Sequence, residues 1–396
     1  MVAEGYKETE IGVIPVEWEV VKVGEILNVQ TGKMNAQDQV ENGKYPFFTR
    51  SVDVQRIDTF AYDIEALFIA GEGNFKVKYY NGKFNLHQRT YMLTSIKDAN
   101  MKFLLNAIQP KVNKLISTSV GSTVQSLRKP LIEDLKIPFP SLKEQEKIAD
   151  ILSTADEKID VIASQIQKAQ TLKKGLLQKL LSEGIGHSEF KDSELGKIPE
   201  SWEISELEKA TTYVDYRGKT PTKTKSGVFL ITARNIKGNK IDYNLSNEYI
   251  AEDDYETVMS RGKPQVGDVL LTTEAPLGQI ASIDKEYVAL AQRIIKYRGI
   301  ENYLDNSFLK HYFISNKFQD LLLLNSTGST VKGIKGSRLK KLKIAIPPLE
   351  EQKQIADILS TADEKLEVLR AKKEKYETLK KGLLQKLLTG EVRVNA

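Results

Sequence analysis

The chain has 396 residues, of which 40% are hydrophobic and 28% charged, and its formal net charge is +5 at pH 7. The absence of cysteine excludes disulfides, thiolate metal sites and a cysteine nucleophile. No apolar run approaches the ~20 residues of a membrane-spanning helix, and the first ten residues are too polar for a signal peptide. We therefore expect a cytoplasmic protein of two or three domains, mildly basic and compatible with a nucleic-acid partner.

Residues 1–140 predict a small mixed α+β domain with mostly antiparallel strands. Strand-like runs at residues 66–70 and 76–80 are bounded by turn residues, and a helix is expected around residues 101–108. Basic and aromatic side chains in this domain are candidate DNA contacts, and the alternative for each of them taken singly is an ordinary solvated surface group. The candidates are Lys33, Arg50, Arg56, Lys76, Lys78 and Tyr80.

Residues 141–184 predict one long helix. Ser141 and Glu144 have the spacing of a capping box at its start. Apolar residues then recur at alternating steps of four and three, the pattern of a heptad seam. At about 1.5 Å per residue the helix would be roughly 60 Å long, too long to bury its own apolar stripe. The seam residues are Ile148, Leu152, Ile159, Ile162, Ile166, Leu176 and Leu180.

Residues 185–347 predict a second mixed α+β domain. Strand-like runs occur at residues 228–232 and 268–273, a helical segment at 306–324, and an acidic turn or helix start at 252–254. Arg and Lys can bind phosphate or guanine, Asn can read adenine, and glycine lets backbone amides approach phosphate. The candidate DNA contacts here are Tyr216, Arg217, Lys219, Thr220, Arg234, Asn235 and Lys237.

Residues 348–396 repeat the long helix. The string IADILSTADEK occurs at residues 148–158 and 355–365, and LKKGLLQKLL at 172–181 and 379–388, so both are displaced by 207 residues. We expect the two helices to form an antiparallel intramolecular coiled coil; the alternatives are packing on their own domains or in a homodimer. Gly175 and Gly382 occupy the same place in both copies, which suggests a close approach or a bend. The second seam comprises Ile355, Leu359, Leu366, Leu369, Leu383 and Leu387.

The two domains are also related to each other. Trp18 matches Trp202 at a displacement of 184 residues, and Arg89 matches Arg293 at 204. Both arginines lie in apolar strand-like runs, so a buried, paired, structural role and a DNA contact are equally supported. Duplicated helices with diverged domains between them indicate one pseudo-two-fold scaffold that presents two binding domains.

Enzyme motifs are missing from the sequence. YRGKTP and GSTVKGIKG both fail the phosphate-binding-loop pattern, and no G-x-S-x-G elbow or Asn-Pro-Pro tripeptide is present. The three histidines are far apart and lack an H-E-x-x-H neighbourhood. We therefore assign no catalytic residue and no metal site.

Several strings together resemble the DNA-specificity subunit of type I restriction–modification enzymes. They are GVIPVEW and GKIPESW, IPFPSLKEQEKIADILS and IPPLEEQKQIADILS, both LKKGLLQKLL copies, YRGKTP, TARNIK and LAQRI. The resemblance implies two target-recognition domains, each reading one half of a bipartite, asymmetric DNA sequence. It also implies that the helices act as a spacer on which two adenine-methyltransferase subunits dock.

The same resemblance implies that a restriction and translocase subunit joins the complex, and that S-adenosylmethionine, ATP and magnesium belong to the partner subunits. This chain would then be non-catalytic. A helix pair of up to about 60 Å could separate the half-sites by at most ~18 base pairs at roughly 3.4 Å each. Two alternatives are a coiled-coil scaffold that assembles proteins without binding DNA, and a nuclease with an unrecognised site.

Overall fold

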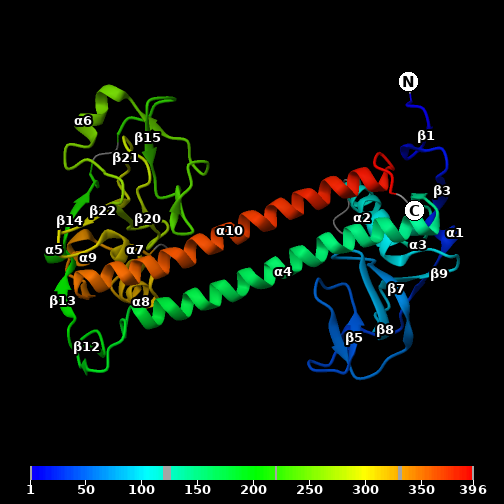
Figure 1. Cartoon of the computed structure of the whole chain (residues 1–396), viewed down its shortest axis with the longest axis horizontal. Helices are drawn as coiled ribbons and strands as arrows, with labels where there is room; N and C mark the ends of the chain where they lie inside the picture. Colours follow the sequence, from blue (N-terminus) through cyan, green and yellow to red (C-terminus); the bar gives the residue numbers. More distant parts are fainter. Residues whose placement is uncertain (1, 119–125, 219–220, 329–331, 395–396) are drawn as a thin grey trace. The chain divides into compact units, whose positions relative to one another are not determined.

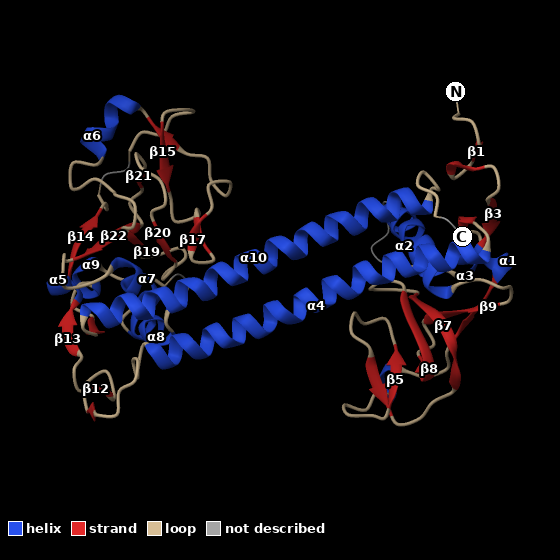
Figure 2. Cartoon of the chain, in the orientation of Figure 1, coloured by secondary structure: helices blue, strands red, loops and turns tan. Residues whose placement is uncertain are grey.

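A computed structural model describes residues 2–118, 126–218, 221–328 and 332–394. The chain packs as two compact units: unit 1 is Met1–Ser164 with Ala371–Ala396, and unit 2 is Gln165–Arg370. Both units mix helices with strands (Figure 1; Figure 2), which confirms the predicted α+β class. None of the helices in the described ranges is both long and apolar enough to cross a membrane.

Unit 1 is built on a six-stranded sheet. Its order is β4 (Leu27–Thr31), β9 (Thr90–Ser95), β7 (Tyr62–Ala70), β8 (Lys78–Leu86), β5 (Tyr45–Phe48) and β6 (Gln55–Ile57). Neighbouring strands are antiparallel except β5 and β8. The predicted run at residues 66–70 lies in β7, and that at 76–80 overlaps the start of β8. The other elements are β1 (Tyr6–Thr9), β2 (Gly12–Pro15), β3 (Glu19–Lys22), α1 (Val23–Ile26), η1 (Ala36–Asp38), α2 (Met101–Thr118), α3 (Lys129–Glu133) and β10 (Lys136–Phe139).

Strand β7 shows why this sheet is buried on both faces. Successive side chains of a strand point to opposite faces. Leu67 and Ile69 therefore belong to one buried cluster with residues of α2, whereas Ala66 and Phe68 belong to an aromatic cluster with Phe48. The rings of Phe48 and Phe68 stack with their centroids 3.9 Å apart. The predicted helix at residues 101–108 is the first half of α2.

Unit 2 contains a four-stranded sheet in the order β14 (Thr211–Asp215), β22 (Ile294–Gly299), β19 (Val269–Thr272) and β20 (Ile280–Ser282). A three-stranded sheet has the order β18 (Tyr249–Ile250), β15 (Val228–Ile231) and β21 (Ala289–Leu290). The other elements are β11 (Phe190–Lys191), β12 (Ile198–Pro199), β13 (Glu203–Glu206), α5 (Leu207–Ala210), β16 (Ile236–Lys237), β17 (Lys240–Ile241), η2 (Glu252–Asp254), α6 (Tyr255–Val258), α7 (Asn306–Ile314), α8 (Asn316–Leu324), α9 (Gly336–Leu339) and β23 (Lys343–Ile346).

Two local predictions in unit 2 are refined by the structure. The helical segment at residues 306–324 is two helices, because Ser315 ends α7 and its Oγ accepts a hydrogen bond from the Phe318 backbone N–H at the start of α8. The acidic residues 252–254 are exposed and form the short 3-10 helix η2 before α6, as a helix start predicts.

The two long helices are α4 (Leu142–Leu180) and α10 (Leu349–Leu388). In unit 1, Ile148 and Leu152 from the beginning of α4 share a core with Leu387 from the end of α10. In unit 2 the roles are reversed, because Leu180 from the end of α4 shares a core with Ile355 from the beginning of α10. The helices are therefore antiparallel within each unit (Figure 1), which confirms the predicted pairing.

Every predicted seam residue is buried or half-buried. Two lysines that interrupt the apolar pattern are matched by acids on the opposite helix: Lys173 pairs with Asp363 in unit 2, and Lys380 Nζ lies 2.5 Å from Asp156 Oδ1 in unit 1. A third, Lys373, pairs with Glu377 of its own helix. The buried members are Ile148, Leu152, Ile162, Leu180, Ile355, Leu359, Leu366 and Leu387, and the half-buried ones are Ile159, Ile166, Leu176, Leu369 and Leu383.

The expected close approach at the helix glycines is wrong. A Cβ atom added to Gly175 or to Gly382 would have no heavy atom within 4 Å outside the helix's own backbone. Both glycines are exposed. No contact among the described residues accounts for a glycine at this place in both copies.

A duplicated tryptophan–glutamate joint fixes each domain to the start of its helix. Trp18 Nε1 donates to Glu144 Oε2 at 2.9 Å, and Trp202 Nε1 donates to Glu351 Oε2 at 3.0 Å. Ser141 Oγ accepts from the Glu144 N–H, as the capping-box spacing predicts. The Glu144 carboxylate, however, binds the tryptophan and does not close the box.

The segment that follows each long helix binds the same joint. Arg393, beyond α10, donates through Nε to Glu144 Oε1 at 2.7 Å. His187, beyond α4, lies with Nε2 2.9 Å from Glu351 Oε1. Each joint thus links a domain, the start of one helix and the exit of the other, which holds the sheets in a fixed orientation on the helices within each unit.

Candidate nucleic-acid interface

The candidate residues of unit 1 differ in how freely they can reach a ligand. Lys33 and Lys76 are exposed. Arg56 is tied down, since its Nε donates to Gly43 O at 2.9 Å and its Nη2 to Lys44 O at 3.1 Å. Lys78 Nζ donates to Ser51 O at 2.7 Å, and partial burial lowers the pKa of this lysine. Tyr80 is half-buried against the ring of Phe48.

Two arginines of unit 1 share one carboxylate. Arg50 Nη1 lies 3.2 Å from Glu72 Oε2, and Arg89 Nη1 lies 3.1 and 3.0 Å from the two oxygens of the same group. Buried His87 accepts a hydrogen bond at Nδ1 from the Arg89 N–H. Burial, followed by the charges of Arg50 and Arg89, lowers the pKa of His87, so the ring is neutral at pH 7. The cluster therefore carries an excess of positive charge.

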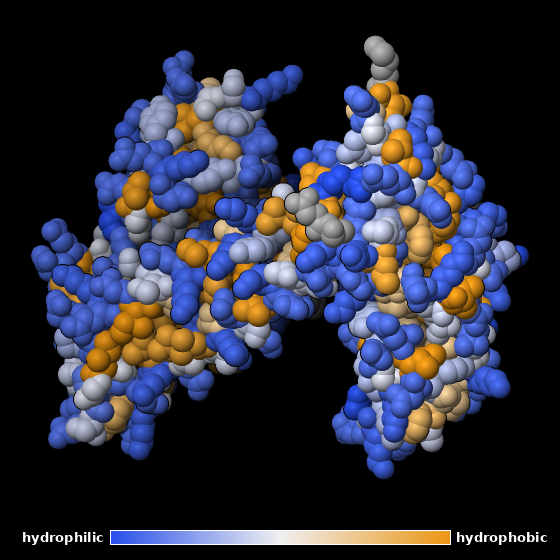
Figure 3. Space-filling view, turned by 45° about the vertical axis from the view of Figure 1, so that its right-hand side comes forward, coloured by the Kyte–Doolittle hydropathy of each residue, from blue (hydrophilic) through white to orange (hydrophobic). Residues whose placement is uncertain are grey.

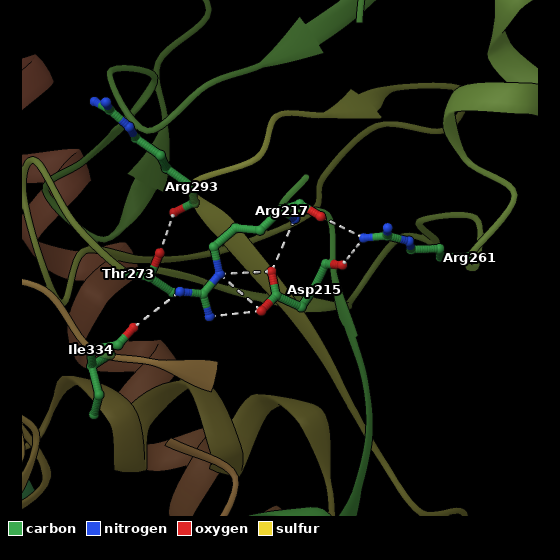
Figure 4. Close-up of polar contacts among 6 residues, drawn as sticks. All are labelled: Asp215, Arg217, Arg261, Thr273, Arg293 and Ile334. Carbon is green, nitrogen blue, oxygen red and sulfur yellow. Dashed lines mark hydrogen bonds and ion pairs between the residues drawn. The ribbon is translucent and has the colours of Figure 1, made fainter. Parts of the chain in front are cut away.

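In unit 2, Arg217 is held in a fork against Asp215. Its Nε and Nη2 donate to the carboxylate at distances of 2.7–3.1 Å, and this bonding is the main cause that raises the pKa of Arg217. Arg261 Nη1 donates to the backbone carbonyls of both residues (Figure 4). The Asp215 carboxylate thereby compensates one of the two positive charges of Arg217 and Arg261, and these bonds brace the end of β14.

Tyr216 and Asn235 lie inside unit 2. The Tyr216 hydroxyl donates to Gly262 O, and burial raises the pKa of this phenol. Asn235 is fully buried: its Oδ1 accepts from the Thr232 N–H at 3.0 Å, while Nδ2 donates to the carbonyls of Asp242 and Ser246. In this structure their side chains shape the loops from within and do not reach the surface.

The loop that Asn235 braces presents exposed Arg234 and Lys237. Arg234 lines a cavity of about 380 Å³ together with Lys223, Glu248 and Arg293. Exposed basic side chains from separate loops therefore converge at this cavity. The other two candidates, Lys219 and Thr220, lie outside the described residues.

Sequence reasoning missed the acids of these clusters, Glu72 and Glu274. Each stands two positions beyond the end of an equivalent strand, β7 or β19. Glu274 Oε1 lies 3.0 Å from Arg293 Nε, which repeats the Glu72–Arg89 pair of unit 1. The side chains of Arg89 and Arg293 are 56% and 51% exposed, so of the two alternatives the buried structural arginine is wrong in its burial, although each arginine is paired with an acid. The available signal was an acid at matching places in both halves.

The arrangement suits binding of a polyanion. Exposed guanidinium and ammonium groups can contact phosphates and base edges. No group of three or more His, Asp or Glu side chains that could hold a metal ion occurs among the residues that the structure describes.

Comparisons with known proteins agree on one family. The model of the type I restriction modification DNA specificity domain matches residues 15–171 and again 199–378. A protein described as the MjaX type I restriction enzyme specificity subunit of Methanocaldococcus jannaschii is 30% identical, over 99% of this chain and 97% of its own length. The EcoDI specificity subunit of Escherichia coli is 25% identical, over 87% of this chain and 81% of its own.

Solved structures show the same fold. A crystal structure of a type I restriction–modification system S subunit from M. genitalium matches with a TM-score of 0.64 at 17% identity, covering 94% of this chain and 96% of that chain. A second, from a study of complex assembly and conformational transition in the type I system, matches with a TM-score of 0.54 at 14% identity, covering 96% and 99%.

Proposed function

Because this chain belongs to the type I restriction–modification specificity subunits, with two target-recognition domains, we propose that each domain reads one half of a bipartite, asymmetric DNA sequence. The observation that carries the proposal is the duplicated arginine–glutamate cluster, which stands at equivalent strand ends in two domains of largely different sequence. Exposed arginines at equivalent places in both domains favour a nucleic-acid ligand over a scaffold that binds only proteins.

The exposed candidates supply contacts of two kinds. Lys33, Lys76 and Lys237 are single flexible charges, suited to phosphates, which fix register and orientation without reading sequence. Arg50 and Arg234 present planar guanidinium groups at the clusters and suit base edges as well as phosphates. The unlike loops around the two clusters would give the two half-sites unlike sequences.

The long helices set the spacing between the half-sites. Helices of 39 and 40 residues with apolar seams and matched Lys–Asp pairs resist bending and sliding, as a spacer requires. The chain itself is non-catalytic in this proposal, and it acts in the cytoplasm. Partner subunits supply adenine methylation and restriction with translocation, and they use S-adenosylmethionine, ATP and magnesium.

Two methyltransferase subunits dock on the outer faces of the helices. Internal packing requires the seam positions to match, but it does not require matching residues at exposed positions. Ile151 and Val161 in unit 1 are nevertheless identical to Ile358 and Val368 in unit 2, and all four are exposed. Patches of apolar surface interrupt the hydrophilic surface of both units (Figure 3). Two matching pairs of exposed apolar residues on one chain fit two copies of one partner.

The proposal is tested by expressing the chain with its methyltransferase partner and mapping methylated adenines across a genome. We expect one bipartite motif with an unspecified gap. Inserting one heptad into each long helix keeps the seams in register and adds about 10 Å, so the gap should grow by about three base pairs. Methylation without a bipartite motif would refute the proposed reading of DNA, and an unchanged gap would refute the spacer.

A further inference from the structure

The glutamate–arginine pairs occupy a rigid and duplicated backbone frame. In unit 1 the Gly71 N–H donates to Arg89 O at 2.8 Å, and in unit 2 the Thr273 N–H donates to Arg293 O at 3.0 Å. A third strand-like segment closes each frame, where Leu127 N–H donates to Gly71 O, and Ile334 N–H to Thr273 O. The backbone of each arginine is therefore fixed, and only its side chain can adjust.

Figure 4 shows the residues around this frame in unit 2. The Arg293 carbonyl also accepts from the Thr273 hydroxyl at 3.4 Å, while the Arg293 side chain extends away from the group formed by Arg217, Asp215 and Arg261. Arg217 Nη1 also donates to Ile334 O at 3.4 Å, so this second arginine braces the frame from its other side. The two arginines thus differ in their contacts: Arg217 is bonded to Asp215 and Ile334 within unit 2, whereas Arg293 lines the cavity that Arg234 also lines.

Glu274 and Glu72 bind Arg293 and Arg89 but leave some N–H donors of each guanidinium unused. Arg293 binds Glu274 through Nε, and its Nη groups have no hydrogen bond to any residue in the described ranges. Arg89 binds Glu72 through Nη1, and its Nε and Nη2 are likewise without a bond to the described part of the chain. A guanidinium has five N–H donors in a fixed plane. Each arginine therefore keeps at least two donors for a ligand, in an orientation set by the acid.

The charge of the acids decides which ligand fits. A carboxylate beside the guanidinium repels a phosphate and weakens the attraction that a phosphate contact needs, more at Arg293 than at Arg89, where Arg50 shares the Glu72 carboxylate. The edge of guanine presents two uncharged acceptors, N7 and O6, that match two donors of one arginine. A base edge is therefore favoured over the backbone at these two positions.

We propose that Arg89 and Arg293 each read one guanine, one in each half of the target. Glu72 and Glu274 are positioning residues that orient these arginines toward the base edge and disfavour a phosphate contact. This inference rests on the proposed DNA-reading function and adds the residues and the base pair involved. It predicts at least one G·C pair in each half of the bipartite motif.

The test uses the full chain with its methyltransferase partner. Methylomes are compared for the wild type, Glu72→Gln, Glu274→Gln and the control Glu286→Gln, which removes the same charge from an exposed loop of unit 2. Glu274→Gln should relax one G·C position of one half-site, and Glu72→Gln one position of the other. Discrimination at that position should fall roughly 5- to 150-fold, the range of one bidentate base contact, and non-specific DNA binding should strengthen.

The outcomes distinguish the proposed DNA-reading function from the assignment of guanine reading to Arg89 and Arg293. A wild type without a bipartite motif would refute the proposed function itself. A bipartite wild-type motif that both glutamine variants leave unchanged, or that they weaken equally at all positions, would refute only the reading by Arg89 and Arg293. A half-site made of A·T pairs alone would also overturn it. The relaxed position in Glu274→Gln, absent from Glu286→Gln, would confirm it.

Discussion

Replacing the helix glycines with alanine should stabilise the protein. Glycine in a helix interior costs about 1 kcal/mol relative to alanine, because the unfolded chain loses more freedom on folding. At Gly175 and Gly382 the added methyl group meets no heavy atom within 4 Å, so no clash offsets this gain. Gly175 lies in unit 2 and Gly382 in unit 1. Each unit has roughly 200 residues, a size for which 1 kcal/mol raises Tm by about 2–4 °C.

Matched control variants are available where each long helix ends. Gly184 and Gly390 have φ angles of +68° and +70°, a left-handed conformation that alanine adopts only at a cost of about 1–2 kcal/mol. An added Cβ would also collide with the Glu351 carboxylate at Gly184 and with the Pro15 ring at Gly390. The same substitution should therefore lower Tm at these two positions.

The Tm of the four single alanine variants is measured by differential scanning calorimetry and compared with that of the wild type. Gly175→Ala should raise the transition of unit 2, Gly382→Ala that of unit 1, and the two effects should add in the double variant because the sites lie in separate units. A lower Tm with alanine at Gly175 or Gly382 would mean that other atoms crowd the added methyl group, and it would refute the predicted stabilisation.

Two further predictions concern pH and partner binding. Burial lowers the pKa of His311 to about 4, so the folded unit binds this proton less readily than the unfolded chain, and stability is lost as pH falls from about 6.5 toward about 4. Between pH 7 and pH 5 this amounts to about 2 kcal/mol, and urea unfolding should show His311→Gln losing correspondingly less than the wild type; equal losses would contradict the assignment. Val161→Glu and Val368→Glu should each remove one of two docked methyltransferase subunits in native mass spectrometry, unlike the exposed loop control Val52→Glu; retention of both subunits would contradict the docking faces.

The helices and their seams could be predicted because their signal is periodic and repeated. Alternating steps of four and three residues specify a buried stripe, and the displacement of 207 residues specifies its partner. The break at Ser315 escaped prediction because a serine can cap a helix or continue one. The predicted close approach at Gly175 and Gly382 is wrong because an identical residue at the same place in two repeats does not reveal what surrounds it.

The candidate site could be predicted by residue type but not by orientation. Asn235 was a sensible DNA contact by chemistry, yet its amide is bonded to carbonyls seven and eleven residues further along the chain. Arg89 and Arg293 were recognised as equivalent, but their exposure depends on where the turn before β9 or β22 ends. A single acid such as Glu72 or Glu274 has no periodicity, so its matching place in the two halves is its one sequence signal, and the arginine that it binds becomes known only from the strand pairing.

The sharing of unit 1 between both ends of the chain has a consequence for biosynthesis. Its core includes Leu387, its N-terminal segment is bonded to the C-terminal one through the Tyr6 hydroxyl and Gly390 O, and Arg393 binds Glu144. Unit 2, by contrast, is one uninterrupted stretch of polypeptide. The domain that leaves the ribosome first can therefore complete its core only after the residues up to Arg393 have been made, whereas the domain made second can complete its core before that point.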